Sequence, residues 1–269
     1  MEIDKIYNEN CLLTMEKMPT GFVDLIVTSP PYDNLRDYID TGIAHFNFEK
    51  IAQSIFRIIK QGGVVVWVVS DQTIDGDESG TSFKQALYFK RIGFRLHDTM
   101  IYQKKCYMPF NHRRYEQEFE YIFVFCKGVL RTFNPILLNC LNAGKIGRHT
   151  TKLDYRYYEK NKSHRCHDRD EISISKETKI HGNIFCYNPT RNRSAHTAVF
   201  PEQLAIDNIQ TWSNEGDIVY DPFSGSGTTC LAAKSLRRHF IGSEINETYF
   251  KDSLERVGIN KRIAKVKKL

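Results

Sequence analysis

Hydrophobic positions follow two periods along the chain, and these periods divide it into strands and helices. Continuous apolar runs at residues 23–27 and 64–69 predict strands buried on both faces of a sheet, and 118–126 predicts a further strand. Apolar residues spaced by three and four at 46–60 and 82–92 predict amphipathic helices. We expect Gly62 and Gly63 to end the first of these helices. Strands that alternate with helices indicate an α/β fold with a mostly parallel sheet.

The C-terminal part of the chain returns to this alternation after a region of different character. In that region, residues 129–195, apolar runs are short, and basic residues, tyrosines, histidines and asparagines dominate. We therefore divide the chain into 1–128, 129–195 and 196–269, with the first and last segments building one sheet and the middle segment forming an insert. The expected elements of the outer segments include strands at 3–7, 94–103, 217–220 and 239–242 and helices at 11–18, 201–212, 228–237 and 246–256.

Positive charge is concentrated in the insert. The chain carries a net charge of +6, and residues 131–195 hold 13 of the 38 lysines and arginines but only 6 of the 32 aspartates and glutamates. The remainder, with 25 basic and 26 acidic residues, is nearly neutral. Basic residues interleaved with tyrosines suit phosphate contact and base stacking, so the insert favours a nucleic-acid partner over a merely solvated loop.

Several other classes of protein are not indicated. Apolar runs are too short for a membrane span, and the polar N-terminus resembles no leader, so we expect a cytoplasmic protein. Seven widely spaced cysteines without a CxxC pair suit reduced thiols. His164, Cys166 and His167 lack a second ligand pair at zinc spacing, so we expect no metal site.

A stiff polar loop follows the strand at 23–27. Its residues are Ser29, Pro30, Pro31 and Tyr32. The two prolines fix their own φ angles and donate no backbone hydrogen bond. The loop therefore presents a hydroxyl, a carbonyl and an aromatic face, a set that could hold a flat ring carrying an amino group. From these residues alone, a simple proline-rich turn is an equal alternative.

A glycine loop joins the strand at 217–220 to the next helix. Gly225 and Gly227 permit a tight turn and a close approach of a ligand to the backbone. Glu244 follows Gly225 by 19 residues, at the end of the next strand, where a carboxylate can bind both ribose hydroxyls. Cys230 replaces the third glycine of a dinucleotide fingerprint, and no lysine of a Walker loop follows. The pattern favours a nucleoside cofactor.

These two loops resemble the catalytic and cofactor loops of S-adenosylmethionine-dependent DNA amino-methyltransferases. The order of the loops, with the basic region between them, is similar to the circularly permuted β group of that family. The resemblance covers residues 1–128 and 196–257. It implies a Rossmann-like methyltransferase fold with a mostly parallel seven-stranded sheet, S-adenosylmethionine as cofactor and double-stranded DNA as substrate, with residues 129–195 as the target-recognition region.

The resemblance also implies roles for individual residues. Asn10 stands where the family often has an aspartate near the adenine, which weakens that assignment. The implied catalytic residues are Ser29, Pro30, Pro31 and Tyr32. The implied cofactor-binding residues are Asn10, Cys11, Asp221, Pro222, Phe223, Ser224, Gly225, Gly227, Thr228, Glu244 and Ile245, with Asp221 at the methionine amino group and Ile245 on the adenine. From the basic insert, the candidates for DNA contact are Arg148, Lys152, Arg156, Arg165, Arg191 and Arg193.

Chemistry narrows the target to an amino nitrogen. Hydrogen bonds from a base amino group to Ser29 Oγ and the Pro30 carbonyl would withdraw its lone pair from the ring, with Tyr32 stacked on the base. The base must leave the duplex, and the methyl group passes directly to nitrogen. None of the eight prolines precedes a cysteine, as methylation at cytosine carbon 5 typically requires. In the resembling family, serine in the first motif position favours cytosine N4.

Other functions stay open at this point. An adenine N6 methyltransferase on the same scaffold is the main alternative, and an RNA or protein methyltransferase is more distant. A nicotinamide-dependent oxidoreductase and a catalytically silent DNA-binding module fit the two loops less well. A cognate restriction endonuclease and a homodimer are open expectations about partners.

Overall fold

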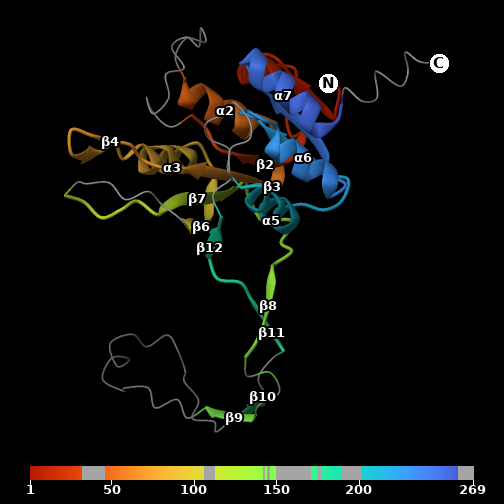
Figure 1. Cartoon of the computed structure of the whole chain (residues 1–269). Coiled ribbons are helices and arrows are strands. Elements are labelled where there is room, and N and C mark those ends of the chain that lie inside the picture. The colour runs from red at the N-terminus through yellow and green to blue at the C-terminus, as the bar shows by residue number, and fades with distance from the viewer. Residues whose placement is uncertain are drawn as a thin grey trace. The chain divides into compact units, whose positions relative to one another are not determined.

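The computed structural model describes residues 1–31, 46–105, 113–141, 143, 146–149, 171–174, 177–188 and 201–259. The chain divides into two compact units (Figure 1). The main unit comprises Met1–Asn134 with Asn183–Leu269, and the small unit comprises Pro135–Gly182. The small unit is narrower than the expected insert 129–195, because residues on both sides of it pack within the main unit.

The main unit is built on an eight-stranded sheet among its described residues. Its strands, in spatial order, are β1 (Lys5–Tyr7), β14 (His239–Ser243), β13 (Ile218–Asp221), β2 (Val23–Thr28), β3 (Ile59–Val69), β7 (Phe119–Cys126), β6 (Arg95–Lys104) and β12 (Ile184–Tyr187). Only β7 runs antiparallel to its neighbours, so the expected mostly parallel α/β fold is confirmed. Seven strands were expected, and β12 is the eighth.

β12 comes from a stretch that the sequence pattern assigned to the insert. It pairs in parallel with β6 at the edge of the sheet. Tyr187 is buried there, with its ring centroid 5.7 Å from that of Tyr102 and its hydroxyl 2.7 Å from Asp207 Oδ2. Four residues are too few to show a period, and this explains why the pattern did not predict the strand.

Strands from the two ends of the chain interleave at the other side of the sheet. β13 pairs with β2, with Val219 opposite Leu25 and Tyr220 opposite Ile26, and β14 pairs with β1. The loops that follow β2 and β13 therefore leave the same edge of the sheet from neighbouring strands. This confirms the expected sheet built from both ends of the chain.

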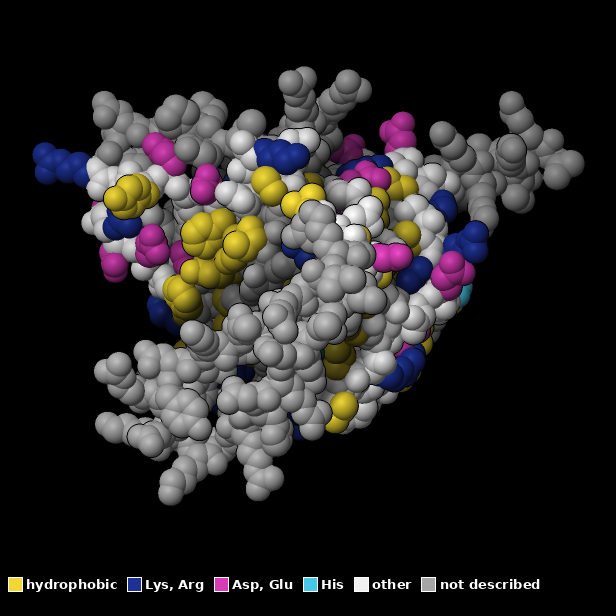
Figure 2. Space-filling model, turned by 90° about the horizontal axis from the view of Figure 1, so that it is seen from below, with side chains coloured by type: hydrophobic (Ala, Val, Ile, Leu, Met, Phe, Trp, Pro, Cys, Tyr) yellow, Lys and Arg dark blue, Asp and Glu magenta, His cyan; other side chains and the backbone are white. Residues whose placement is uncertain are grey.

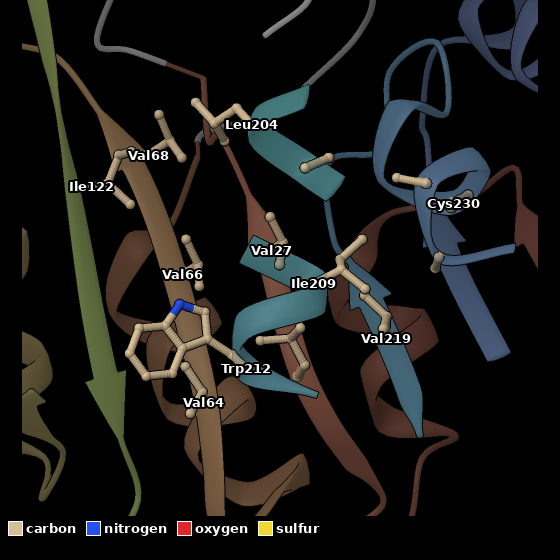
Figure 3. Close-up of a cluster of buried hydrophobic side chains, with 14 of the residues drawn as sticks. Val27, Val64, Val66, Val68, Ile122, Leu204, Ile209, Trp212, Val219 and Cys230 are labelled. Carbon is tan, nitrogen blue, oxygen red and sulfur yellow. The ribbon is translucent and has the colours of Figure 1, made fainter. Parts of the chain in front are cut away.

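Helices cover both faces of the sheet. One face packs against α1 (Cys11–Glu16), α2 (Phe48–Ile58) and α3 (Thr81–Arg91), and the other against α5 (Glu202–Trp212), α6 (Thr228–Ser235) and α7 (Glu247–Val257). Alternate residues of the central strands face opposite layers, and every residue of β2 is buried. Figure 3 shows the α5 layer, where Val27, Val66 and Val219 surround Leu204, Ile209 and Trp212.

The expected end of the helix after residue 46 is wrong in one respect. α2 ends at Ile58, and Gly62 and Gly63 lie within β3. Gly62 has a φ of 77°, and a Cβ on Gly63 would stand 2.9 Å from the Asp24 carbonyl oxygen. The pairing of β2 with β3 shifts register beside these residues. The glycines therefore permit an irregularity in β3, where the backbones of β2 and β3 approach closely.

Three short antiparallel strand pairs lie outside the main sheet. β4 (Thr73–Ile74) and β5 (Asp77–Glu78) form a hairpin between β3 and α3. In the small unit, β8 (Leu137–Asn139) pairs with β11 (Thr178–Ile180), and β9 (Ile146–His149) pairs with β10 (Glu171–Ile174), both antiparallel. All residues of β8 and β11 are exposed.

The surface of the described residues mixes both signs of charge. Figure 2 shows basic and acidic side chains interspersed on one face, together with a group of hydrophobic side chains. This agrees with the near balance of charge outside residues 131–195. Of the helices described, none has the length and apolar character needed to cross a membrane. His164, Cys166 and His167 lie outside the described residues.

Candidate active site

The glycine loop makes a tight turn from β13 into α6. Gly225 and Gly227 have φ angles of 50° and 79°, in the left-handed region that favours glycine. A Cβ on Gly227 would stand 3.1 Å from Ser253 Cβ and 3.2 Å from Val257 Cγ2 of α7. The second glycine is therefore required both by the turn and by the packing of α7 against it.

Glu244 follows β14 and is tied to the glycine loop. Its Oε2 accepts a hydrogen bond from the Gly225 amide at 2.8 Å, and its Oε1 accepts one from the Asn246 amide at 2.8 Å. Burial raises the pKa of Glu244, and the two amide donors oppose that rise. Because each carboxylate oxygen has a further lone pair, this fixed carboxylate can still accept from two hydroxyls. Ile245 beside it is 40% exposed and offers an apolar surface.

Asp221 links the glycine loop to the end of β2. Its Oδ1 accepts hydrogen bonds from Thr28 Oγ1 at 2.6 Å and from the Phe223 amide at 3.0 Å. The carboxyl group is buried, which raises its pKa to about 6. The geometry makes Asp221 a connection between the two loops, and the direct contact with a methionine amino group stays a prediction. Thr28 was missed as a functional residue, although a hydroxyl at the end of a buried strand is a usable signal.

The proline loop begins beside this connection. Pro30 is buried, and Ser29 and Pro31 are half-buried, whereas Tyr32 lies outside the described residues. Thr229 Oγ1 of α6 donates to the Val27 carbonyl at 3.2 Å, and this is a second link between β2 and the cofactor side. The chain therefore enters the proline loop from a strand end that is held by the glycine loop and its helix.

The N-terminal turn lies against Glu244. Asn8 Nδ2 donates to the Glu244 carbonyl at 2.8 Å. Asn10 caps α1, with its Oδ1 accepting from the Leu12 amide at 2.9 Å, so this oxygen has a structural role. Cys11 is buried, and burial raises the pKa of its thiol to about 12, so the thiol is neutral. Their contact with an adenine stays a prediction.

The remaining residues of the glycine loop are buried or half-buried. Pro222, Ser224 and Thr228 are buried, and Phe223 is half-buried with its ring centroid 5.8 Å from that of Phe46. Ser224 packs on Gly242, where a Cβ would stand 3.0 Å from Ser224 Cβ. Sequence reasoning missed Gly242, although a glycine inside a strand signals such a close approach.

Thr228 and Ser226 have hydroxyls that accept from Arg256 of α7, at 2.8 Å and 3.0 Å. This contact occupies Thr228, which the resemblance assigned to the cofactor, and it introduces Arg256, which sequence reasoning did not single out. An arginine 29 residues after a glycine loop gives no local signal of such a contact.

The residues predicted to contact DNA lie in the small unit or outside the described residues. Arg148 lies in β9 of the small unit, of which only the backbone is described. Lys152, Arg156, Arg165, Arg191 and Arg193 lie outside the described residues. Their role in DNA binding stays a prediction from charge.

The donor set fits the S-adenosylmethionine that the resemblance implies. Glu244 suits a ribose diol, Ile245 suits the face of an adenine, and the left-handed glycines allow close approach to the loop backbone. Glu244 and Gly225 are joined by a hydrogen bond, so the acid that is predicted to bind the ribose is attached directly to the loop.

Comparisons with known proteins agree with this arrangement. Residues 23–255 match a family model of the N6/N4 methyltransferase type described as DNA methylase. The chain is 46% identical to the orphan methyltransferase M.BamHII of Bacillus amyloliquefaciens, over 87% of this chain and 88% of the relative. It is 28% identical to the DNA adenine methyltransferase YhdJ of Escherichia coli (strain K12), over 99% and 88%.

Solved structures show the same fold. The structure of the PvuII DNA methyltransferase (cytosine-N4-specific) superposes with a TM-score of 0.69 at 18% identity, covering 94% of this chain and 85% of that one. At this identity the likeness concerns the fold alone, and it confirms the Rossmann-like arrangement of the main unit.

Proposed function

Because the chain belongs to the N6/N4 DNA methylase family and is a DNA methyltransferase that uses S-adenosylmethionine, we propose that it methylates the exocyclic N4 of cytosine at a specific site in duplex DNA. The methyl group passes directly to a base that has left the duplex stack. A cytoplasmic location is an expectation from sequence.

One observation carries the proposal. β2 and β13 are paired neighbours, and the hydrogen bond of 2.6 Å between Thr28 Oγ1 and Asp221 Oδ1 joins their carboxyl ends. Ser29 and Pro30 follow Thr28 directly, so the acceptors for an amino group start beside the glycine loop. Ligands of open α/β sheets bind at the carboxyl ends of neighbouring strands, and this supports one site for base and methyl donor.

The cofactor side of the site is a set of fixed contacts. Glu244 holds the ribose hydroxyls, Ile245 packs on the adenine, and the glycine loop lies along the methionine part. When bound, S-adenosylmethionine supplies an electrophilic methyl group. The chain's contribution is orientation, since a methyl transfer requires donor sulfur, methyl carbon and acceptor nitrogen in line.

The base side of the site activates a poor nucleophile. The lone pair of an exocyclic amine is delocalised into the ring. Hydrogen bonds from the amine to Ser29 Oγ and to the Pro30 carbonyl localise that lone pair on nitrogen and aim it at the methyl group. Tyr32 stacks on the ring. No covalent intermediate with the enzyme is required.

Serine at position 29 favours cytosine over adenine, following the motif preference of the family. Adenine N6 methylation is the second candidate, because YhdJ is named a DNA adenine methyltransferase and aligns over 99% of this chain. RNA and protein substrates are more distant candidates, because the chain belongs to a family of DNA methylases. A restriction endonuclease partner is compatible with relatives named type II methyltransferases, whereas M.BamHII is named an orphan. A homodimer remains an expectation from sequence.

Nucleoside mass spectrometry distinguishes these targets. Unmethylated plasmid DNA is treated with the protein and S-adenosylmethionine and then digested to nucleosides. We expect N4-methylcytosine. N6-methyladenine without N4-methylcytosine contradicts the proposed base. Methylation of RNA or protein in parallel reactions, with no methylated nucleoside from the DNA, contradicts DNA as the substrate.

A further inference from the structure

Arg256 of α7 contacts the glycine loop and a second helix with one guanidinium group. Its Nη1 donates to Ser226 Oγ at 3.0 Å and to Thr228 Oγ1 at 2.8 Å, and its Nη2 donates to Glu202 Oε2 at 3.1 Å. The side chain is 29% exposed. One residue therefore joins α5, α7 and the loop that precedes α6.

The electrostatic position of this group is unusual. Thr228 is the first residue of α6, and the N-terminus of a helix carries partial positive charge, so a cation there is disfavoured. Glu202, which forms the ion pair with Arg256, compensates for this cost. The guanidinium binds two neutral hydroxyls at the same time, and its planar donor geometry permits all three contacts.

The loop is held from two directions. On one side, Glu244 accepts from the Gly225 amide. On the other, α7 contributes Arg256 at Ser226 and Thr228, while Ser253 and Val257 limit the space at Gly227. Gly225 is therefore attached to the ribose-binding acid, whereas Ser226 and Thr228 are attached to α7. A change in Arg256 would loosen the second attachment and leave the first.

We propose that Arg256 is a positioning residue that sets the affinity for S-adenosylmethionine by fixing the glycine loop against α7. This inference rests on the cofactor site of the proposed function and is independent of which base is methylated. Arg256 acts through Ser226 and Thr228 and has no part in the transfer itself. Its loss therefore affects cofactor binding more than the rate at saturating cofactor.

The test compares Arg256→Met and Arg256→Lys with the wild-type enzyme. Cofactor Kd is measured by calorimetry without DNA, and KM for S-adenosylmethionine, KM for DNA and kcat are measured on plasmid DNA. For Arg256→Met we expect Kd and KM for the cofactor to rise about tenfold, because two charge-assisted hydrogen bonds to the loop are lost. We expect kcat at saturating cofactor and KM for DNA to stay within about twofold. Arg256→Lys should restore part of the affinity, since an ammonium can reach a hydroxyl but lacks the planar fork.

Two further variants separate positioning from stability. Arg237→Met is the matched control, because Arg237 is an exposed arginine paired with Glu215 at 3.4 Å, and its cofactor affinity should equal that of wild type. Glu202→Gln retains the hydroxyl contacts of Arg256 and removes its charge partner, and should raise the cofactor Kd about two- to threefold. This variant and Arg256→Lys decide the question if Arg256→Met does not fold.

An unchanged cofactor Kd in folded Arg256 and Glu202 variants overturns the proposal, as does a loss of kcat at unchanged KM. The proposed function fails by different results: wild-type protein that does not bind S-adenosylmethionine, or that methylates a different atom. Because cofactor Kd is measured without DNA, an adenine product would leave the inference on Arg256 standing.

Discussion

The two units of this chain use their residues in opposite ways. In the main unit, every residue of β2 is buried, and its neighbours β3 and β13 are buried along most of their lengths. In the small unit, every residue of β8 and β11 is exposed. Packing therefore constrains the strands that lead to the proline loop and the glycine loop. Packing constrains β8 and β11 of the small unit much less, because their side chains are exposed.

This difference predicts where substitutions act. Changes at the paired ends of β2 and β13 should alter catalysis or stability. Changes of charge in the small unit should alter DNA binding at nearly constant stability. Each of the following experiments tests one side of that contrast.

The largest effect is expected at Ser29. Ser29→Ala removes a hydrogen-bond acceptor for the amino group, and kcat should fall by about a hundred- to a thousandfold. Cofactor Kd from calorimetry and Tm should remain those of wild type, because the strand below is unchanged. Ser29→Asp, which keeps an acceptor, is the matched variant and should retain more activity than Ser29→Ala. Equal kcat for Ser29→Ala and wild type would contradict the role of Ser29 as an acceptor for the amino group.

The buried carboxyl group of Asp221 should make stability depend on pH. Its pKa of about 6 in the folded chain lies above the ordinary value of 3.8, so the folded state binds the proton more tightly than the unfolded state. This contribution to stability is present below about pH 4 and is lost as the pH rises through 6. At about 1.4 kcal/mol per pKa unit, the loss approaches about 3 kcal/mol.

The measurement is urea unfolding of cofactor-free wild type and Asp221→Asn between pH 4 and pH 7. The asparagine has no charge to bury, so the difference in unfolding free energy between the two proteins should shift in favour of Asp221→Asn as the pH rises. A difference that is constant across this range would contradict the assigned pKa.

A smaller loss is expected when the link between the two loops is cut. Thr28→Val removes the hydroxyl that donates to Asp221 and keeps the shape of the side chain. We expect the free energy of unfolding to fall by about 2 kcal/mol at pH 7, as for a hydrogen bond to a charged group. kcat should fall as well, since Ser29 follows this anchor. Thr20→Val, at an exposed threonine, is the control and should leave both values unchanged.

The smallest effect on stability is expected in the small unit. Arg148→Ala should weaken binding to duplex DNA a few-fold and reduce the slope of log affinity against log salt by about one if the residue contacts a phosphate. The free energy of unfolding should change by less than about 0.5 kcal/mol. A large loss of stability with unchanged DNA affinity would contradict the proposed division between the two units.

The sequence predicted those parts of the site that follow from local patterns. Buried apolar runs located β2 and β13, and the spacing of Glu244 from Gly225 placed an acid at the end of β14, where the structure has it. A sheet built from both ends of the chain was expected, and the pairing of β2 with β13 confirms it. Each of these inferences needed only the residues of a short segment and no knowledge of contacts with distant segments.

The parts that were missed depend on contacts between distant segments. Thr28 and Asp221 are 193 residues apart, and neither shows in its own segment that the two side chains meet. Arg256 lies on a helix whose periodicity does not show that it reaches the glycine loop. Gly62 and Gly63 were assigned to a helix end because their use in a strand depends on the neighbouring backbone of Asp24.

The path of the methyl group tests the central claim most directly. In a single turnover with S-adenosylmethionine labelled in its methyl group, the reaction is quenched at intervals, and the label is measured in cofactor, protein and digested DNA. The account predicts that the label passes from cofactor to N4-methylcytosine without appearing on the protein at any time. Label on the protein before the DNA, or on a carbon atom of the base, would contradict a site in which Ser29 and Pro30 present an amino nitrogen to the methyl donor.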